Sequence, residues 1–112
     1  MTGFSRLSIA IGATAMGVIG TFILAAAPAL AADASNGKRL AERWCTGCHL
    51  VSSSQTKASD QVPPFATIAK MPDFSAAKMA LFLLDPHPKM PSFSLTRSEA
   101  SDIAAYINSL RR

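Results

Sequence analysis

The apolar residues beyond Asp33 recur at helical spacing, and no stretch alternates apolar and polar residues as a half-buried strand would. The polar segment DASN at 33–36 offers cap residues for a first helix that runs up to Cys45. One face of this helix carries small or apolar residues at i, i+3, i+4 and i+7: Gly37, Leu40, Ala41 and Trp44. The pattern therefore predicts helices joined by loops.

Two further helices are predicted in the C-terminal half. Residues 51–71 are rich in Ser, Thr, Lys and Pro, so we expect a loop with room for one short helical turn. A second helix is expected from the N-cap Ser75 to Leu84, because Asp85-Pro86 then ends it. The total of three to four helices indicates a small all-α domain.

The last helix is predicted from a capping box of Thr96 and Glu99 to the end of the chain. Arg111 and Arg112 are expected to interact favourably with the negative end of its dipole. Its apolar stripe consists of Ala100, Ile103, Ala104, Ile107 and Leu110.

Gly37 lies on the apolar stripe of the first helix, where glycine costs about 1 kcal/mol of helix propensity relative to alanine. Such a glycine predicts that another helix crosses there at close range. Tyr106 of the last helix is the candidate that fills the space, since a flat ring packs well against a residue without a side chain. The alternative is a helix that starts one turn later.

The N-terminal residues 1–31 have the pattern of a secretory signal peptide. One basic residue, Arg6, precedes an apolar run that ends in a small-x-small site, Ala29 and Ala31. Cleavage after Ala31 would leave residues 32–112 as the mature domain, exported to the periplasm by the general secretory route because no twin arginine is present. The alternative is an uncleaved membrane anchor, since about 18 apolar residues can span a bilayer.

A mature chain of this size buries little core and usually needs a disulfide, a metal or an apolar cofactor. One Cys-x-x-Cys disulfide would contribute little, because the loop that it closes is short. The charges are scattered, and loss of Arg6 lowers the net charge from +4 to +3. This charge balance excludes a nucleic-acid-binding role. It does not explain how so small a domain completes its hydrophobic core.

The motif CTGCH holds the only two cysteines, Cys45 and Cys48, followed directly by His49. A thioredoxin-like pair would need a βαβ pattern, which the sequence lacks. A structural zinc site typically has four Cys or His ligands. The only other histidine is His87, so the chain offers too few. Covalent haem fits every part of the motif: two thiols for the vinyl groups and a histidine for the iron. Export places these thiols where bacteria attach haem.

The sequence resembles the small monohaem cytochromes c with histidine–methionine ligation. The resemblance covers NGKRLAERWCTGCH, PPF, PHPKMPSFSLT and EASDIAAYI, nearly the whole mature chain. It implies an all-α fold wrapped around one covalent haem c, with the first and last helices crossing. It also implies thioether bonds at Cys45 and Cys48, His49 as proximal iron ligand, and a distal methionine in a proline-rich loop before the last helix.

Two methionines are the main candidates for the distal iron ligand: Met71 in KMPDF and Met90 in KMPSF. Met90 is favoured because Pro88 and Pro91 stiffen its loop and a helix follows. Met71 is expected to be a core or loop residue, and Met79 to pack within its helix. His87 would give a bis-histidine centre of lower potential, but it lies between prolines close to Met90.

A ligating histidine normally donates its other ring N–H to an acceptor. In similar cytochromes a proline carbonyl beyond the motif accepts this hydrogen bond, which indicates Pro63, with Pro64 as the neighbouring possibility. Four aromatic side chains are expected to pack around the haem or on its helices: Trp44, Phe65, Phe82 and Phe93.

Iron ligated on both faces has no open position for a substrate, so the expected function is one-electron transfer and not enzyme catalysis. The predicted protein is a monomeric periplasmic carrier between a dehydrogenase or quinol-oxidising complex and a terminal oxidase or reductase, with Lys89 near the docking edge. The alternative is a five-coordinate haem protein that binds or senses a gas or peroxide. A thiol redox or zinc module is the third possibility.

Overall fold

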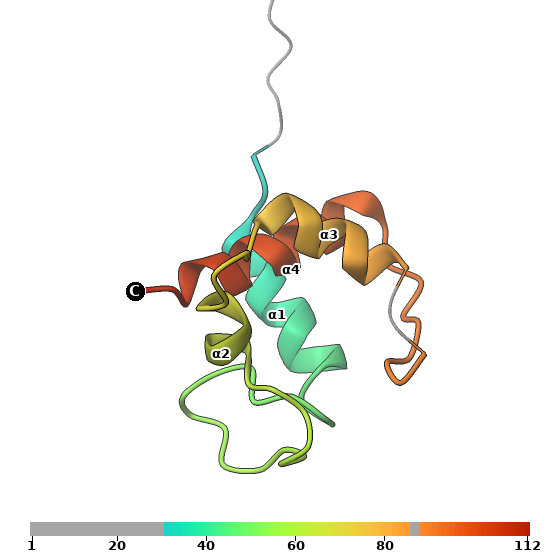
Figure 1. Cartoon of the computed structure of the whole chain (residues 1–112). Helices are drawn as coiled ribbons and strands as arrows, with labels where there is room; N and C mark the ends of the chain where they lie inside the picture. Colours follow the sequence, from blue (N-terminus) through green and yellow to red (C-terminus); the bar gives the residue numbers. More distant parts are fainter. Residues whose placement is uncertain (1–30, 86–87) are drawn as a thin grey trace, which may run out of the picture.

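The computed structural model describes residues 31–85 and 88–112, so the predicted signal peptide up to residue 30 and His87 lie outside the described residues. Within these ranges the chain forms helices and no strand, as the sequence predicted. The helices are α1 (Ala34–Trp44), α2 (Phe65–Ala69), α3 (Ala76–Leu84) and α4 (Arg97–Ser109). Figure 1 shows α1 and α3 on either side of α4, with the long 45–64 loop beneath α1 and α2.

The predicted helix starts are confirmed by their caps. The Asp33 carboxylate accepts hydrogen bonds from the backbone of the first turn of α1, and the Ser75 hydroxyl accepts one from the first turn of α3. At α4, Thr96 and Glu99 form the reciprocal capping box. The hydrogen bonds from Thr96 lower the pKa of Glu99, because they favour its ionised form.

Helix α1 crosses α4 at Gly37, which is buried. A Cβ added at Gly37 would overlap the backbone carbonyl of Asp102 and lie 2.8 Å from the Ile103 nitrogen. The predicted close crossing is therefore confirmed, and α1 already begins at Ala34. The prediction that Tyr106 fills the space was wrong, because the α4 backbone itself occupies it and Tyr106 lies one turn further along.

Helix α4 forms the centre of the core. Most of its predicted stripe is buried, while Leu110 is partly buried against the same core. The side chains of Ala41 from α1, Phe65 from α2 and Leu83 from α3 join it in one apolar cluster. This packing holds the loop that follows α1 and the loop that precedes α4 on the same side of the molecule.

The end of α4 differs from the prediction. The helix stops at Ser109, and its last turn contains no basic residue. The Arg111 guanidinium instead lies 5.4 Å from the centre of the Phe74 ring and donates a hydrogen bond to the Phe74 carbonyl at 3.5 Å. Arg111 thus ties the C-terminus to the segment before α3.

Candidate haem site

The cysteine motif forms a tight turn directly after α1. Cys45 caps the helix, and its carbonyl accepts hydrogen bonds from the backbone N–H groups of Cys48 at 3.2 Å and His49 at 2.8 Å. Cys45 is buried and Cys48 is exposed, and both are free thiols. The turn therefore brings the two sulfurs and the imidazole together from five consecutive residues.

His49 is held by the residue that the sequence indicated. Its Nδ1 donates a hydrogen bond to the Pro63 carbonyl at 2.7 Å. A carbonyl can only accept, so Nδ1 carries the proton and Nε2 keeps a lone pair for a metal. The alternative acceptor, the Pro64 carbonyl, instead receives the backbone N–H groups of Thr67 and Ile68 at the start of α2.

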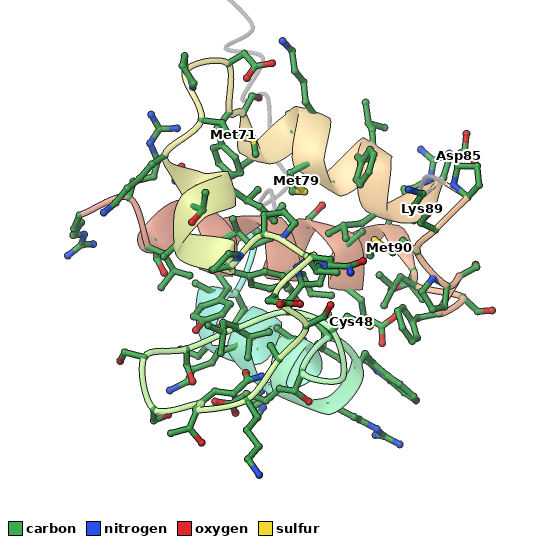
Figure 2. The ribbon with its side chains drawn as sticks, turned by 60° about the horizontal axis from the view of Figure 1, so that its bottom comes forward. Cys48, Met71, Met79, Asp85, Lys89 and Met90 are labelled. Atoms are coloured by element: carbon green, nitrogen blue, oxygen red, sulfur yellow. The ribbon has the colours of Figure 1, made fainter. Side chains whose placement is uncertain are left out.

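A largely apolar cavity of about 600 Å³ opens beside this turn. Its volume lies within the roughly 300–1,000 Å³ that is usual for cofactor sites. Cys45, Cys48 and His49 line one part of it, and α3 with the loop after α3 supplies another part. Figure 2 shows Met79 and Met90 on the side of α3 that faces the loop of Cys48.

Three methionines line the cavity: Met71, Met79 and Met90. Met90 lies in the proline-flanked loop and is partly buried against the core. Met79 also packs against the core from α3, as expected, whereas Met71 is 41% exposed in the loop after α2. The sequence did not indicate that Met79 reaches the same cavity as the two candidate ligands, Met71 and Met90.

The donor set fits a haem better than a zinc ion. Among residues 31–85 and 88–112, no three His, Cys, Asp or Glu side chains gather where they could hold a metal. The cavity instead combines two thiols, one imidazole nitrogen, thioether sulfurs and apolar walls, which suit a covalently attached and axially ligated macrocycle.

Comparison with known proteins agrees with this chemistry. The cytochrome c family model matches residues 34–111. The chain belongs to the cytochrome c family. It is 65% identical over 83 residues to cytochrome c-552 of Bradyrhizobium diazoefficiens, an alignment that covers 74% of this chain and 80% of that protein. No solved structure gives a significant match.

Its cofactor is therefore covalent haem c with its iron, and this cytochrome is an electron carrier of the c type. The predicted family, fold class and cofactor are confirmed. Within the part of the chain that the structure describes, no helix is long and apolar enough to cross a membrane.

The thiols of this cytochrome do not resemble a reactive redox pair. Burial, followed by the charge of Cys48, raises the pKa of the Cys45 thiol to about 11. Redox-active Cys-x-x-Cys pairs depend on a lowered thiol pKa, because the thiolate is the attacking species. The environment of Cys45 is instead that of a sulfur enclosed at the edge of an apolar cavity.

The four aromatic side chains that the sequence indicated all line the cavity of this cytochrome: Trp44, Phe65, Phe82 and Phe93. The Phe65 ring lies 5.2 Å from the His49 ring, centre to centre. Trp44 and Phe93 lie 5.8 Å apart, so the end of α1 contacts the loop of Met90. Trp44 is nevertheless 40% exposed, because it lies at the margin of the cavity.

Three polar residues that support the site were not predicted from the sequence. The Tyr106 hydroxyl donates to the Val51 carbonyl at 2.6 Å, in the loop just after His49. Asp102 is a buried carboxylate that accepts from the Asp33 backbone at 2.7 Å and the Asn36 amide at 2.8 Å. Gln55 bonds to the backbone of Thr46 and His49 within the motif and of Val51 after it. Only the helical register of Tyr106 and Asp102, next to the apolar stripe, could have indicated their burial.

Proposed function

We propose that this cytochrome is a periplasmic one-electron carrier whose haem is attached through Cys45 and Cys48 and ligated by His49 and Met90. The observation that carries the proposal is that one apolar cavity is lined by all four of these side chains. The haem supplies one-electron exchange at its iron, and the protein supplies attachment, orientation and an apolar environment.

His49 is the proximal ligand in this proposal. Its Nδ1 donates to the Pro63 carbonyl, which fixes the tautomer, orients the ring and makes Nε2 a better donor to a metal. Pro63 is therefore assigned as the residue that orients the proximal ligand.

Met90 is the distal ligand in this proposal. Its loop is stiffened by Pro88 and Pro91 and held at its far side by the contact between Phe93 and Trp44. Met79 packs against the core from α3, and Met71 lies in a more exposed loop. Methionine ligation and an apolar pocket both raise the reduction potential, as suits a respiratory carrier.

The mature protein in this proposal comprises residues 32–112 and works in the periplasm. Ala31 and Ala32 are exposed, and α1 is capped at Asp33, so the proposed cleavage site precedes the first folded element and is accessible. The family match likewise begins only at residue 34.

The proposed partners are redox proteins that meet a monomer in brief encounters. A dehydrogenase or quinol-oxidising complex would donate the electron, and a terminal oxidase or reductase would accept it. Lys89 lines the cavity next to Met90 and is the proposed docking charge. Such encounters bury little area and dissociate quickly.

The visible spectrum of the purified protein in both oxidation states tests this function. We expect the weak sulfur-to-iron band in the oxidised form and no binding of carbon monoxide to the reduced form. Absence of that band together with carbon monoxide binding would support the five-coordinate sensor instead. A denatured polypeptide that carries no haem, as shown by a peroxidase-active haem stain, would exclude covalent attachment.

A further inference from the structure

The loop that follows the haem-binding motif has little regular backbone structure to hold it. Its few backbone hydrogen bonds include Ser59 N–H to the Cys48 carbonyl at 3.1 Å and Phe65 N–H to the Leu50 carbonyl at 2.9 Å. Neither of these reaches the carbonyls of Thr46 or His49. The side chain that does reach them is Gln55, in the middle of the loop.

The Gln55 amide nitrogen lies within hydrogen-bond distance of three backbone carbonyls: Thr46 at 3.1 Å, His49 at 2.9 Å and Lys57 at 2.7 Å. Its amide oxygen accepts the Val51 N–H at 3.1 Å. An amide has two N–H donors, so two of the three carbonyls share one hydrogen. The opposite orientation of the amide would put its oxygen against three carbonyl oxygens, so the network permits only one.

These contacts join the two halves of the haem-binding motif. Thr46 lies between the two cysteines, and His49 follows them, so one amide fixes the backbone on both sides of Cys48. His49 is then held at two ends: its ring by the Pro63 carbonyl and its own carbonyl by Gln55. Gln55 is partly buried, which protects these bonds from competition with water.

We infer that Gln55 is a positioning residue for the proximal ligand. It sets the rotation of the His49 imidazole by fixing the peptide that carries it. This inference rests on the proposed role of His49 as iron ligand, and it adds that the orientation depends on a side chain six residues further along the chain. A residue that merely closed the loop would contribute stability alone.

The first test uses the unmodified holoprotein. The side-chain amide protons of Gln55 should exchange with solvent at least about tenfold more slowly than those of the control, the exposed Asn108, which does not line the haem cavity. Equal exchange at the two amides would overturn the inference. This measurement does not depend on which residues ligate the iron.

The second test compares variants by the haem-methyl NMR shifts of the oxidised holoprotein, a pattern that follows the orientation of the axial imidazole. Gln55→Glu keeps the acceptor and the volume but removes both donors, and Gln55→Ala removes the whole amide. Both should change the shift pattern. Ser54→Ala, which loses only an exposed hydroxyl contact with Ser52, should leave it unchanged.

Tyr106→Phe separates positioning from stability. It removes a buried hydrogen bond to the same loop without touching His49, so it should lower the unfolding free energy and preserve the shift pattern. If the Gln55 variants lose stability with an unchanged shift pattern, the inference is contradicted and only a stabilising role remains. If the unmodified protein lacks histidine–methionine spectra, it is the proposed function that fails.

Discussion

The backbone of Gly37 lies directly against the backbone carbonyl of Asp102, so the α1–α4 crossing has no room for a Cβ atom. Gly37→Ala gains about 1 kcal/mol of helix propensity but forces two rigid helices apart. We expect a net loss of about 2 kcal/mol or more in the free energy of unfolding, measured by denaturant titration of the holoprotein.

Ser35→Ala is the matched control, because it introduces the same residue at an exposed position of the same helix. This variant should stay within about 0.5 kcal/mol of the parent protein. Equal stability of the two variants would show that the helices do not cross as closely as described.

Asp102 stabilises the start of α1 from α4. Asp102→Asn replaces one acceptor oxygen by a donor, so the bond from either the Asp33 backbone or the Asn36 amide is lost in a buried site. We expect the unfolding free energy to fall by about 1–3 kcal/mol. The exposed Asp60→Asn variant is the control and should change it by less than about 0.5 kcal/mol.

Tyr106 makes the free energy of unfolding depend on pH in the alkaline range. Burial, followed by the charge of Glu42, raises its pKa above the ordinary value near 10. As the pH rises, the unfolded chain loses the phenolic proton at the ordinary pKa, whereas the folded protein keeps it to a higher pH. The contribution of Tyr106 to stability is therefore fully present below the unfolded-state pKa and is lost as the pH rises through the folded-state pKa. Tyr106→Phe should be less stable at neutral pH, by about 1 kcal/mol, and should show a shallower alkaline decline. A parallel decline in both proteins would contradict this assignment.

The proposed processing site can be checked by mass. Protein isolated from the periplasm should have the mass of residues 32–112 plus one haem. A mass that includes residues 1–31, with the protein in the membrane fraction, would instead identify an anchor. Substituting Ala31 by a bulky residue should slow processing, since the small-x-small pattern is what the peptidase recognises.

The parts of this molecule that local chemistry determines were predictable from its sequence. Asp33, Ser75 and Thr96 start helices because their side chains accept hydrogen bonds from the first turn, whatever the rest of the fold does. The haem-binding motif is likewise contiguous, so its spacing can be read directly from the sequence.

The parts that depend on long-range contacts were not predictable. Gly37 indicated a close crossing but not that the α4 backbone would fill it. Gln55 resembles any polar loop residue until the fold brings three carbonyls to its amide, and Asp102 resembles a solvated helix residue until α1 covers it. The three methionines could be ranked by their local sequence, but only the folded chain shows that all three line one cavity.

The most direct test of the central claim is the spectrum of three methionine variants of the oxidised holoprotein: Met90→Ala, Met71→Ala and Met79→Ala. Met90→Ala alone should lose the sulfur-to-iron band, and its reduced form should bind carbon monoxide. The other two variants should keep the band, with Met79→Ala less stable by about 1 kcal/mol or more because its side chain is partly buried against the core. Loss of the band in Met71→Ala or Met79→Ala, with the band intact in Met90→Ala, would contradict the proposed ligand set.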